Sequence, residues 1–105
     1  MNVLIVTFNL KDVSDADYRA GCASEAEPFA AIPSLISKVW LADRESNTYG
    51  GVYIFSDRSS LEAYVGSELF KSIGATPSFQ DLAAASFELI EAPTRITRGL
   101  AEIAA

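Results

Sequence analysis

The sequence contains no histidine, one cysteine and one tryptophan among its 105 residues. Without histidine, the chain lacks the commonest metal ligand and the commonest general base near neutral pH, and haem held by histidine is excluded. Cys22 has no partner for an internal disulfide. No G-x-G-x-x-G or Walker pattern is present to hold a nucleotide phosphate. We therefore expect no metal site and no cofactor, whether haem, flavin or nicotinamide.

Positive charge is scarce and scattered. Eight lysines and arginines stand against 14 aspartates and glutamates, which gives a net charge of -6. A chain without a basic patch is a poor partner for nucleic acid or an anionic membrane. The apolar run Val3–Phe8 is too short to span a bilayer and has no basic flank. We expect a cytoplasmic protein that binds neither nucleic acid nor membrane.

The stretch from Leu35 to Phe55 predicts a hairpin. Leu35–Asp43 and Tyr49–Phe55 are rich in strand-forming residues, and the polar residues 44–47 form the turn. Pairing Asp43 with Thr48 sets the register of the two strands. This register places Trp40 opposite Gly51, Lys38 opposite Tyr53 and Ile36 opposite Phe55.

Because side chains alternate along a strand, the hairpin has two different faces. One is aliphatic and carries Leu35, Ser37, Val39, Leu41, Gly50, Val52 and Ile54. The other, the aromatic face, carries Ile36, Lys38, Trp40, Tyr49, Tyr53 and Phe55. We expect the aliphatic face to pack beneath helices and the aromatic face to be left uncovered.

The rest of the chain completes one small domain. We predict a strand over Val3–Asn9, a helix from Asp15 to about Ala31 that contains Pro28, a second helix capped by Ser56 or Asp57 with a further turn over residues 67–73, and a strand over Ala83–Glu91. Residues 79–82 remain undecided between strand and loop. The order β-α-β-β-α-β is that of the ferredoxin-like α+β fold, an antiparallel sheet with both helices on one face. Residues 1–92 form this domain, and residues 93–105 form a C-terminal tail that is helical only near residues 100–103.

Two helices cover only one face of such a sheet. The aromatic face, joined by Ile5 of the first strand, would then form a large apolar patch in water, which usually marks an interface or a ligand site. A second copy of the chain is the simplest cover for this patch. We expect a homodimer through the sheet face.

Particular residues in and around this hairpin also resemble a known family. Pro33, the run Lys38–Trp40, the run Gly50–Phe55, the acidic cap Asp57 and the later Ser60, Ala63 and Tyr64 resemble the YdhR-like mono-oxygenases of the dimeric α+β barrel superfamily. The resemblance implies a homodimer with a pocket beside each sheet. It also implies oxidation of aromatic or polyketide-like compounds without a cofactor, which occurs among relatives. The histidine-based sites of those relatives have no counterpart in this chain.

The candidate site residues lie mainly on the aromatic face. We predict that a small aromatic ligand contacts Ile36, Lys38, Trp40, Tyr53 and Phe55. The candidate catalytic residues are Lys38 as a partner for an enolate, Tyr53 as a hydrogen-bond donor, Asn9 as an orienting amide and Glu88 as a base. The alternatives are packing for Trp40 and Tyr53, an ion pair between subunits for Lys38, a strand-end cap for Asn9 and a surface position for Glu88.

Three functions remain open at this stage. The first is a cofactor-independent mono-oxygenase acting on a small aromatic or polyketide-like compound, because an electron-rich substrate anion can itself reduce oxygen in a dry pocket. The second is a dimer that binds a small molecule, or is associated with stress, without catalysis. The third is an isomerase or decomposing enzyme on the same scaffold.

Overall fold

The computed structural model describes residues 1–100. Its elements follow the predicted order, with one further short helix after the last strand: β1 (Asn2–Leu10), α1 (Asp15–Ala30), β2 (Leu35–Asp43), β3 (Thr48–Phe55), α2 (Arg58–Val65), α3 (Glu68–Gly74), β4 (Phe79–Glu88) and α4 (Glu91–Ile96). The turn predicted over residues 67–73 is α3, and α4 was not predicted. The helix expected near residues 100–103 lies almost entirely outside the described residues.

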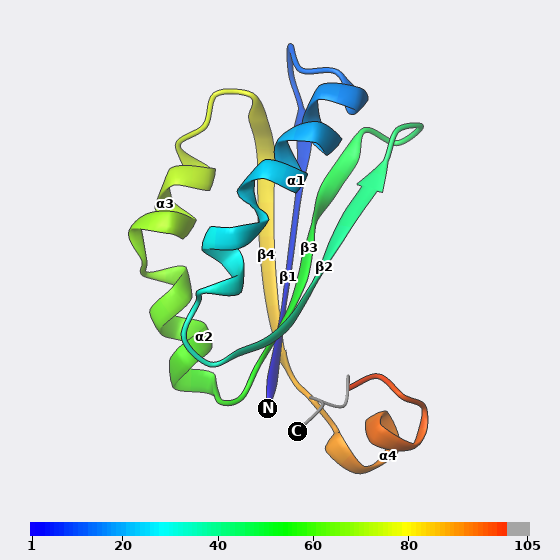
Figure 1. The fold of residues 1–105 in the computed structure, drawn as a ribbon, viewed down its shortest axis with the longest axis vertical. Coiled ribbons are helices and arrows are strands. Elements are labelled where there is room, and N and C mark those ends of the chain that lie inside the picture. Colours follow the sequence, from blue (N-terminus) through cyan, green and yellow to red (C-terminus); the bar gives the residue numbers. More distant parts are fainter. Residues whose placement is uncertain (101–105) are drawn as a thin grey trace.

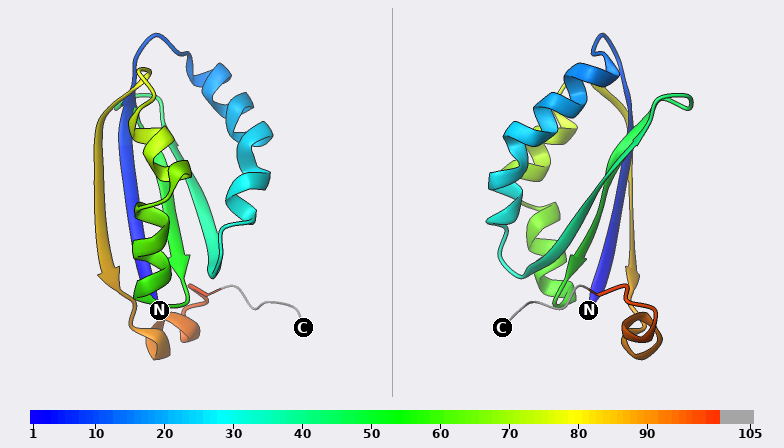
Figure 2. Two further views of the ribbon diagram at one scale, coloured as in Figure 1. Left: turned by 90° about the vertical axis from the view of Figure 1, so that its left-hand side faces the viewer. Right: turned by 45° about the vertical axis from the view of Figure 1, so that its right-hand side comes forward.

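The four strands form one antiparallel sheet in the order β2-β3-β1-β4. Helices α1, α2 and α3 all lie against the same face of this sheet, while α4 lies beyond its end (Figure 1). Figure 2 shows that none of the described helices covers the opposite face, which we call the open face. The ferredoxin-like α+β fold predicted from the sequence is therefore confirmed.

Each of the first three helices begins at a side chain that caps it. The Ser14 Oγ accepts a hydrogen bond from the Asp17 amide at 3.1 Å, and the Asp57 carboxylate accepts one from the Ser60 amide at 2.7 Å. At α3 the Ser67 Oγ accepts from the Phe70 amide at 3.2 Å. These bonds satisfy backbone donors that the helix leaves free, which is why the helices start where the sequence indicated.

The hairpin register was predicted correctly over most of its length. Asp43 pairs with Thr48, Trp40 with Gly51 and Lys38 with Tyr53. The prediction was wrong at the far end, because Phe55 pairs with Leu35 and a register shift lies between Leu35 and Ser37. Such a bulge leaves the extra residue without a partner. Ile36 is that residue, so it does not continue the aromatic row.

The expectation about the two hairpin faces was also wrong. The buried core consists of Leu4, Val6, Phe8, Phe29, Tyr49, Tyr53, Phe55, Leu61 and Tyr64, so the helices pack on the aromatic face. The large rings bury more apolar area than aliphatic side chains, and the helices bring matching rings to the same layer. Phe55, for example, is fully buried with its ring centroid 5.7 Å from that of Tyr64 of α2.

The open face is aliphatic and continuous across the sheet. The strand register aligns the row Val39, Val52, Ile5 and Ala85, and beside it the row Ser37, Ile54, Val3 and Phe87. Val39 and Phe87 are each 55% exposed. The placement of Ile5 on the uncovered face was correct, but the hairpin residues beside it are the aliphatic ones.

The C-terminal part differs from expectation in its boundaries. β4 begins at Phe79 rather than Ala83, and it ends at Glu88, after which the Leu89 amide bonds to the Met1 carbonyl at 3.0 Å. Pro93 lies inside α4, whose first turn tolerates proline. The division into a domain over 1–92 and a tail over 93–105 stays a prediction.

No helix within residues 1–100 has the length and apolar character needed to cross a membrane.

Candidate functional site

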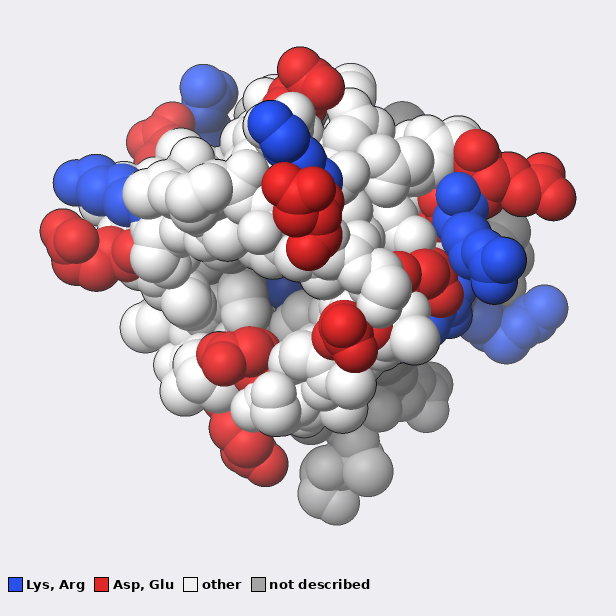
Figure 3. Space-filling view, turned by 90° about the horizontal axis from the view of Figure 1, so that it is seen from above, with Lys and Arg blue, Asp and Glu red and all other residues white. Residues whose placement is uncertain are grey.

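A cavity of about 390 Å³ lies between the aromatic face and the helices α1 and α3. The sheet contributes Val6, Phe8, Lys38, Trp40, Gly51 and Tyr53 to its wall, and the helices contribute Tyr18, Cys22, Phe29, Leu69 and Ile73. Figure 3, seen from the upper end of Figure 1, shows a hollow with a basic side chain at its floor. Within residues 1–100, Lys38 is the only lysine or arginine that lines the cavity. The cavity is therefore an apolar chamber with one cation inside it.

The Lys38 ammonium lies among three aromatic rings. Its Nζ is 3.4 Å from the ring centroid of Phe29, 3.4 Å from that of Trp40 and 4.7 Å from that of Tyr53. Ring faces attract a cation, and each such contact contributes about 0.5–2 kcal/mol. Within residues 1–100, no ion pair or hydrogen bond engages this nitrogen. The rings therefore hold Lys38 in place without neutralising it.

Two adjacent glycines shape the strand beneath Lys38. A Cβ on Gly51 would lie 2.9 Å from the Lys38 Cε, so the absence of a side chain lets Lys38 fold across the sheet. Gly50 has a φ of 151°, and a Cβ there would collide with the Val6 carbonyl oxygen at 1.8 Å. Gly50 thus permits close packing of β3 on β1, whereas Gly51 makes space for the amine.

Burial changes the acid–base behaviour of Lys38. Loss of water around the half-buried ammonium lowers the pKa of Lys38 to about 7, and the nearby Cys22 acts in the opposite direction. Desolvation disfavours the charged form of an amine, which is the direction seen. Near neutral pH the site therefore contains both the ammonium and the free amine.

Tyr53 lines the cavity, and its hydroxyl group meets that of Tyr64 of α2. The Tyr64 hydroxyl donates a 2.9 Å hydrogen bond to the Tyr53 hydroxyl oxygen. Burial is the main cause that raises the pKa of both phenols. Because Tyr53 accepts in this bond, its own hydrogen is free to be donated to a ligand or water. Tyr53 is therefore a phenol with a spare donor hydrogen, on the residue paired with Lys38 in the sheet.

Tyr18 and Cys22 face the same cavity from α1. The Tyr18 ring packs edge-on against Tyr49, with centroids 4.8 Å apart, and against Phe8 at 5.9 Å. Burial, followed by the adjacent Cys22 thiol, raises the pKa of Tyr18. Tyr18 thus stays protonated in the physiological range and serves as a second phenolic group in the cavity.

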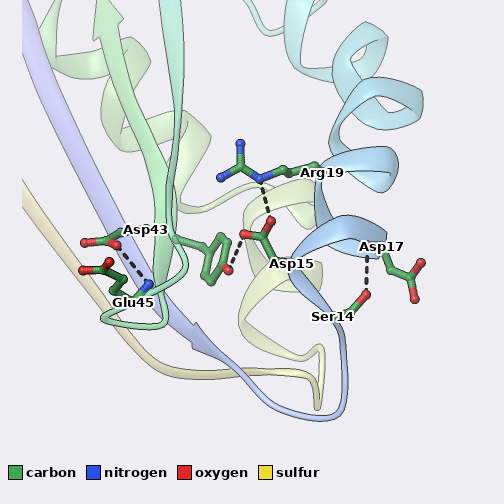
Figure 4. Close-up of polar contacts among 7 residues, drawn as sticks. Ser14, Asp15, Asp17, Arg19, Asp43 and Glu45 are labelled. Carbon is green, nitrogen blue, oxygen red and sulfur yellow. Dashed lines mark hydrogen bonds and ion pairs between the residues drawn. The ribbon is translucent and has the colours of Figure 1, made fainter.

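The mouth of the cavity is acidic. Asp17 and Glu25 line it and are exposed, and Figure 3 shows acidic side chains around the hollow. Nearby, Asp15 accepts a 2.6 Å bond from the Tyr49 hydroxyl and pairs with Arg19 at 2.8 Å (Figure 4). These contacts fasten the first turn of α1 to the sheet beside the entrance.

Three of the predicted substrate-binding residues, Lys38, Trp40 and Tyr53, line the cavity together. Their role in binding stays a prediction. Ile36 and Phe55 are not among the lining residues. The aromatic face, which was expected to be uncovered, forms one wall of this cavity, and α1 and α3 form the opposite wall.

The two remaining catalytic candidates lie away from the cavity. The Asn9 side chain donates a 2.7 Å bond to the Asn47 carbonyl and so braces the hairpin turn. Glu88 is exposed at the end of β4 and pairs with Asn2. Neither residue is among those that line the cavity. The alternatives given above, a strand-end cap for Asn9 and a surface position for Glu88, account for both positions.

Sequence reasoning missed the contribution of α1. Tyr18, Cys22 and Phe29 form a stripe at helical spacing within the helix predicted from Asp15 to about Ala31, and that stripe forms the outer wall of the cavity. The signal was the presence of aromatic rings in this stripe, since rings on a helix pack well against rings on a sheet.

Residues 1–100 contain no cluster of three or more His, Cys, Asp and Glu able to hold a metal.

The fold and the cavity define a ferredoxin-like α+β protein with an aromatic chamber between its sheet and its helices. The chain belongs to the family described as "Putative mono-oxygenase ydhR", whose profile matches residues 3–100. The family resemblance drawn from the hairpin residues is thus confirmed. The comparison with curated proteins gave no significant match.

Solved structures confirm the fold. A protein of unknown function from Nitrosomonas europaea, NE2512, is 18% identical over 87% of this chain and 90% of its own, with a TM-score of 0.72. SnoaB from Streptomyces nogalater, a cofactor-independent oxygenase, is 16% identical over 86% and 93%, with a TM-score of 0.66. MhuD, solved with manganese protoporphyrin IX, is 14% identical over 86% and 95%, with a TM-score of 0.67. The present chain offers no histidine to ligate such a porphyrin.

Proposed function

We propose that this protein is a mono-oxygenase that oxidises a small, planar, weakly acidic aromatic or polyketide-like compound without a bound cofactor. One observation carries the proposal. Lys38 lines an apolar cavity, and among the described residues its nitrogen is held by ring faces alone. An amine in this setting accepts a proton from a phenol or enol and then, as an ammonium, stabilises the anion that it has formed.

The substrate anion supplies the electrons. It transfers one electron to O2, the resulting carbon radical and superoxide combine to form a C–O bond, and the hydroperoxide loses water to give a quinone. The overall change is phenol plus O2 to quinone plus water, which balances without an external reductant. Lys38 would hold the anion, and the Tyr53 hydroxyl would donate a hydrogen bond to the oxygen being reduced.

The alternatives from the sequence use the same cavity. Proton abstraction by Lys38 without oxygen would make the protein an isomerase or a decomposing enzyme. Tight binding without turnover would make it a small-molecule carrier or a stress-associated dimer. Oxygen consumption separates these functions, because only the mono-oxygenase removes one O2 for each quinone formed.

The binding step is tested with para-nitrophenol and its uncharged analogue para-nitroanisole. Trp40 is the only tryptophan, so its fluorescence reports the cavity. Para-nitrophenol should quench it saturably and should absorb as the phenolate when bound. Lys38→Ala should weaken this binding by roughly 1–3 kcal/mol, because a charge-assisted contact is lost in a partly dry site. Lys71→Ala, an exposed lysine on α3, serves as the matched control.

Turnover is then measured with alpha-naphthol in an oxygen electrode. The proposal expects oxygen uptake that matches quinone formation and falls at least tenfold in Lys38→Ala, since the anion is no longer formed or held. Binding of para-nitrophenol without any oxygen uptake for a series of phenols would favour the carrier. Equal binding by the wild type and Lys38→Ala would show that Lys38 is the wrong polar group.

We also propose a homodimer through the open face. Eight aligned positions on four strands carry no charged side chain, and the two most exposed of the large ones are Val39 and Phe87. A second copy matches this uncharged surface, whereas the remaining surface of a chain with net charge -6 repels its copies. Location in the cytoplasm likewise stays a prediction.

A further inference from the structure

The position of the Lys38 amine suits a second kind of chemistry. Lys38 lines the cavity together with Phe29 and Trp40, and its nitrogen lies 3.4 Å from the ring centroids of both. Within residues 1–100 this nitrogen has no hydrogen bond or ion pair. Gly51 leaves the space that lets the side chain reach this position. A primary amine that is desolvated and unpaired is a nucleophile toward carbonyl carbon.

We propose that Lys38 captures small aromatic aldehydes and ketones by forming an imine between its Nζ and their carbonyl carbon. The cavity fits a single planar carbonyl compound, whose ring would lie among Phe29, Trp40 and Tyr53. This activity goes beyond the proposed oxygenation, since it requires neither oxygen nor an acidic substrate. It depends only on the cavity and on the amine.

The step balances with no added reactant. The Nζ lone pair attacks the carbonyl carbon, the C=O π electrons pass to oxygen, and a proton moves from nitrogen to that oxygen to give a carbinolamine. The C–O bond then breaks as a donor protonates the leaving hydroxyl, and the nitrogen loses its last proton to give C=N and one water. The donor is one of the two phenols that line the cavity, Tyr18 or Tyr53, and its phenolate takes back the proton that the nitrogen loses.

The amine is available at neutral pH. Desolvation lowers the pKa of Lys38 to about 7, so a substantial share of it is unprotonated at about pH 7.5. An ordinary exposed lysine is almost entirely protonated there. The titratable groups that share the cavity are Tyr18, Cys22, Asp17 and Glu25 of α1 and Tyr53 of β3. Both carboxylates lie at the exposed mouth.

The test traps the imine by reduction. The protein is incubated with para-anisaldehyde and sodium cyanoborohydride at about pH 7.5, digested, and mapped by mass spectrometry. The chain has only three lysines, so the peptides of Lys11, Lys38 and Lys71 are compared directly. The proposal expects the Lys38 peptide to be modified at least tenfold faster than the other two, which are exposed.

Two controls separate capture in the cavity from general amine reactivity. The N-terminal amine also reacts with aldehydes near this pH, but para-nitrophenol should protect Lys38 and not Met1. Lys38→Arg keeps a cation and should abolish the cavity adduct while Trp40 emission still reports a folded chamber.

Each outcome decides the inference. Preferential labelling of Lys38 that para-nitrophenol blocks supports it. Labelling of Lys38 no faster than Lys71 overturns it, even where para-nitrophenol binds and phenols are oxidised, so the proposed oxygenase survives that result. Conversely, a captured aldehyde with no oxygen uptake on phenols would retain the imine and remove the oxygenase.

Discussion

The hydroxyl of Tyr49 on β3 donates a 2.6 Å hydrogen bond to the Asp15 carboxylate in the first turn of α1. This bond is the main cause that lowers the pKa of Asp15 and raises the pKa of Tyr49. It connects the outer wall of the cavity to its floor, because α1 carries Tyr18 and Cys22 and the sheet carries Lys38 and Trp40. The entrance is therefore held by a polar contact, whereas the interior is held by rings.

Removal of the hydrogen bond between Tyr49 and Asp15 should weaken the packing of α1 on the sheet. Tyr49→Phe keeps the ring and deletes the hydroxyl, so we expect a loss of about 1–2 kcal/mol in the free energy of unfolding, measured by urea denaturation. Arg19→Ala removes the exposed half of the same cluster and should cost less than about 0.5 kcal/mol. Equal losses for the two variants would show that the Tyr49 bond contributes no more than a surface ion pair.

The stability of the protein should rise with pH above neutrality because of Lys38. Its folded pKa of about 7 lies below the unfolded value of about 10.4, so between these values the unfolded chain binds a proton that the folded chain does not. Unfolding is then disfavoured increasingly from about pH 7 to 9.5, by about 1–2 kcal/mol after allowance for partial solvent screening.

Lys38→Met is the matching control for this pH dependence. It keeps an unbranched apolar stem and should flatten the rise between pH 7 and 9.5 in urea midpoints. Above about pH 10 the slope should reverse in both proteins, since burial raises the pKa values of Tyr18, Tyr53 and Tyr64 and the unfolded chain then loses protons first. An identical slope in Lys38→Met would place the titration elsewhere.

The two adjacent glycines should respond differently to alanine. Gly50→Ala forces a Cβ into the Val6 backbone at a positive φ, so it should cost more than about 2 kcal/mol in the free energy of unfolding. Gly51→Ala meets the flexible Lys38 stem at 2.9 Å and the Val39 carbonyl oxygen at 3.3 Å, without a positive φ, so it should cost less, while it displaces the amine and changes Trp40 fluorescence. Gly74→Ala, with open space around it, should be neutral or slightly stabilising.

The open face should govern self-association. Val39→Glu places a carboxylate at a position that is 55% exposed in the single chain, so the fold should survive. Burial of that unpaired charge between two copies would cost several kcal/mol, and sedimentation should show the mass halved. Ala42→Glu, exposed on the other face of β2, should leave the dimer intact. A wild type that sediments as a monomer would contradict the proposed dimer.

Local patterns in the sequence determined most of the fold but not which face of the sheet the helices cover. Helix starts at Ser14 and Asp57 and the pairing of Lys38 with Tyr53 follow from neighbouring residues, so they were predictable. The covered face depends on how separate elements match, because β1 offers Leu4, Val6 and Phe8 on one side and almost equally apolar residues on the other. The rings of Phe29 and Tyr64 on the helices decide the choice.

The candidate site was predictable only in part for a related reason. Lys38, Trp40 and Tyr53 share a face by alternation, which the sequence shows directly. The bulge that displaces Ile36 and the approach of Tyr18 and Cys22 depend on three-dimensional packing. Asn9 was a candidate for orienting a ligand. Its actual contact, a bond to the Asn47 carbonyl, joins residues far apart in the sequence and could not be predicted from local patterns.

The acidic mouth and the basic floor of the cavity together determine the protonation state in which a substrate enters and the place where it ionises. Asp17 and Glu25 repel anions at the entrance of the cavity, and the net charge of -6 adds to this repulsion. The Lys38 amine lies farther inside the cavity. A phenol would thus pass the entrance in its neutral form and ionise only after it reaches Lys38. Acidification would increase the entering species and deplete the accepting amine, so the rate should peak where these two populations balance, between the pKa of Lys38 and that of the substrate.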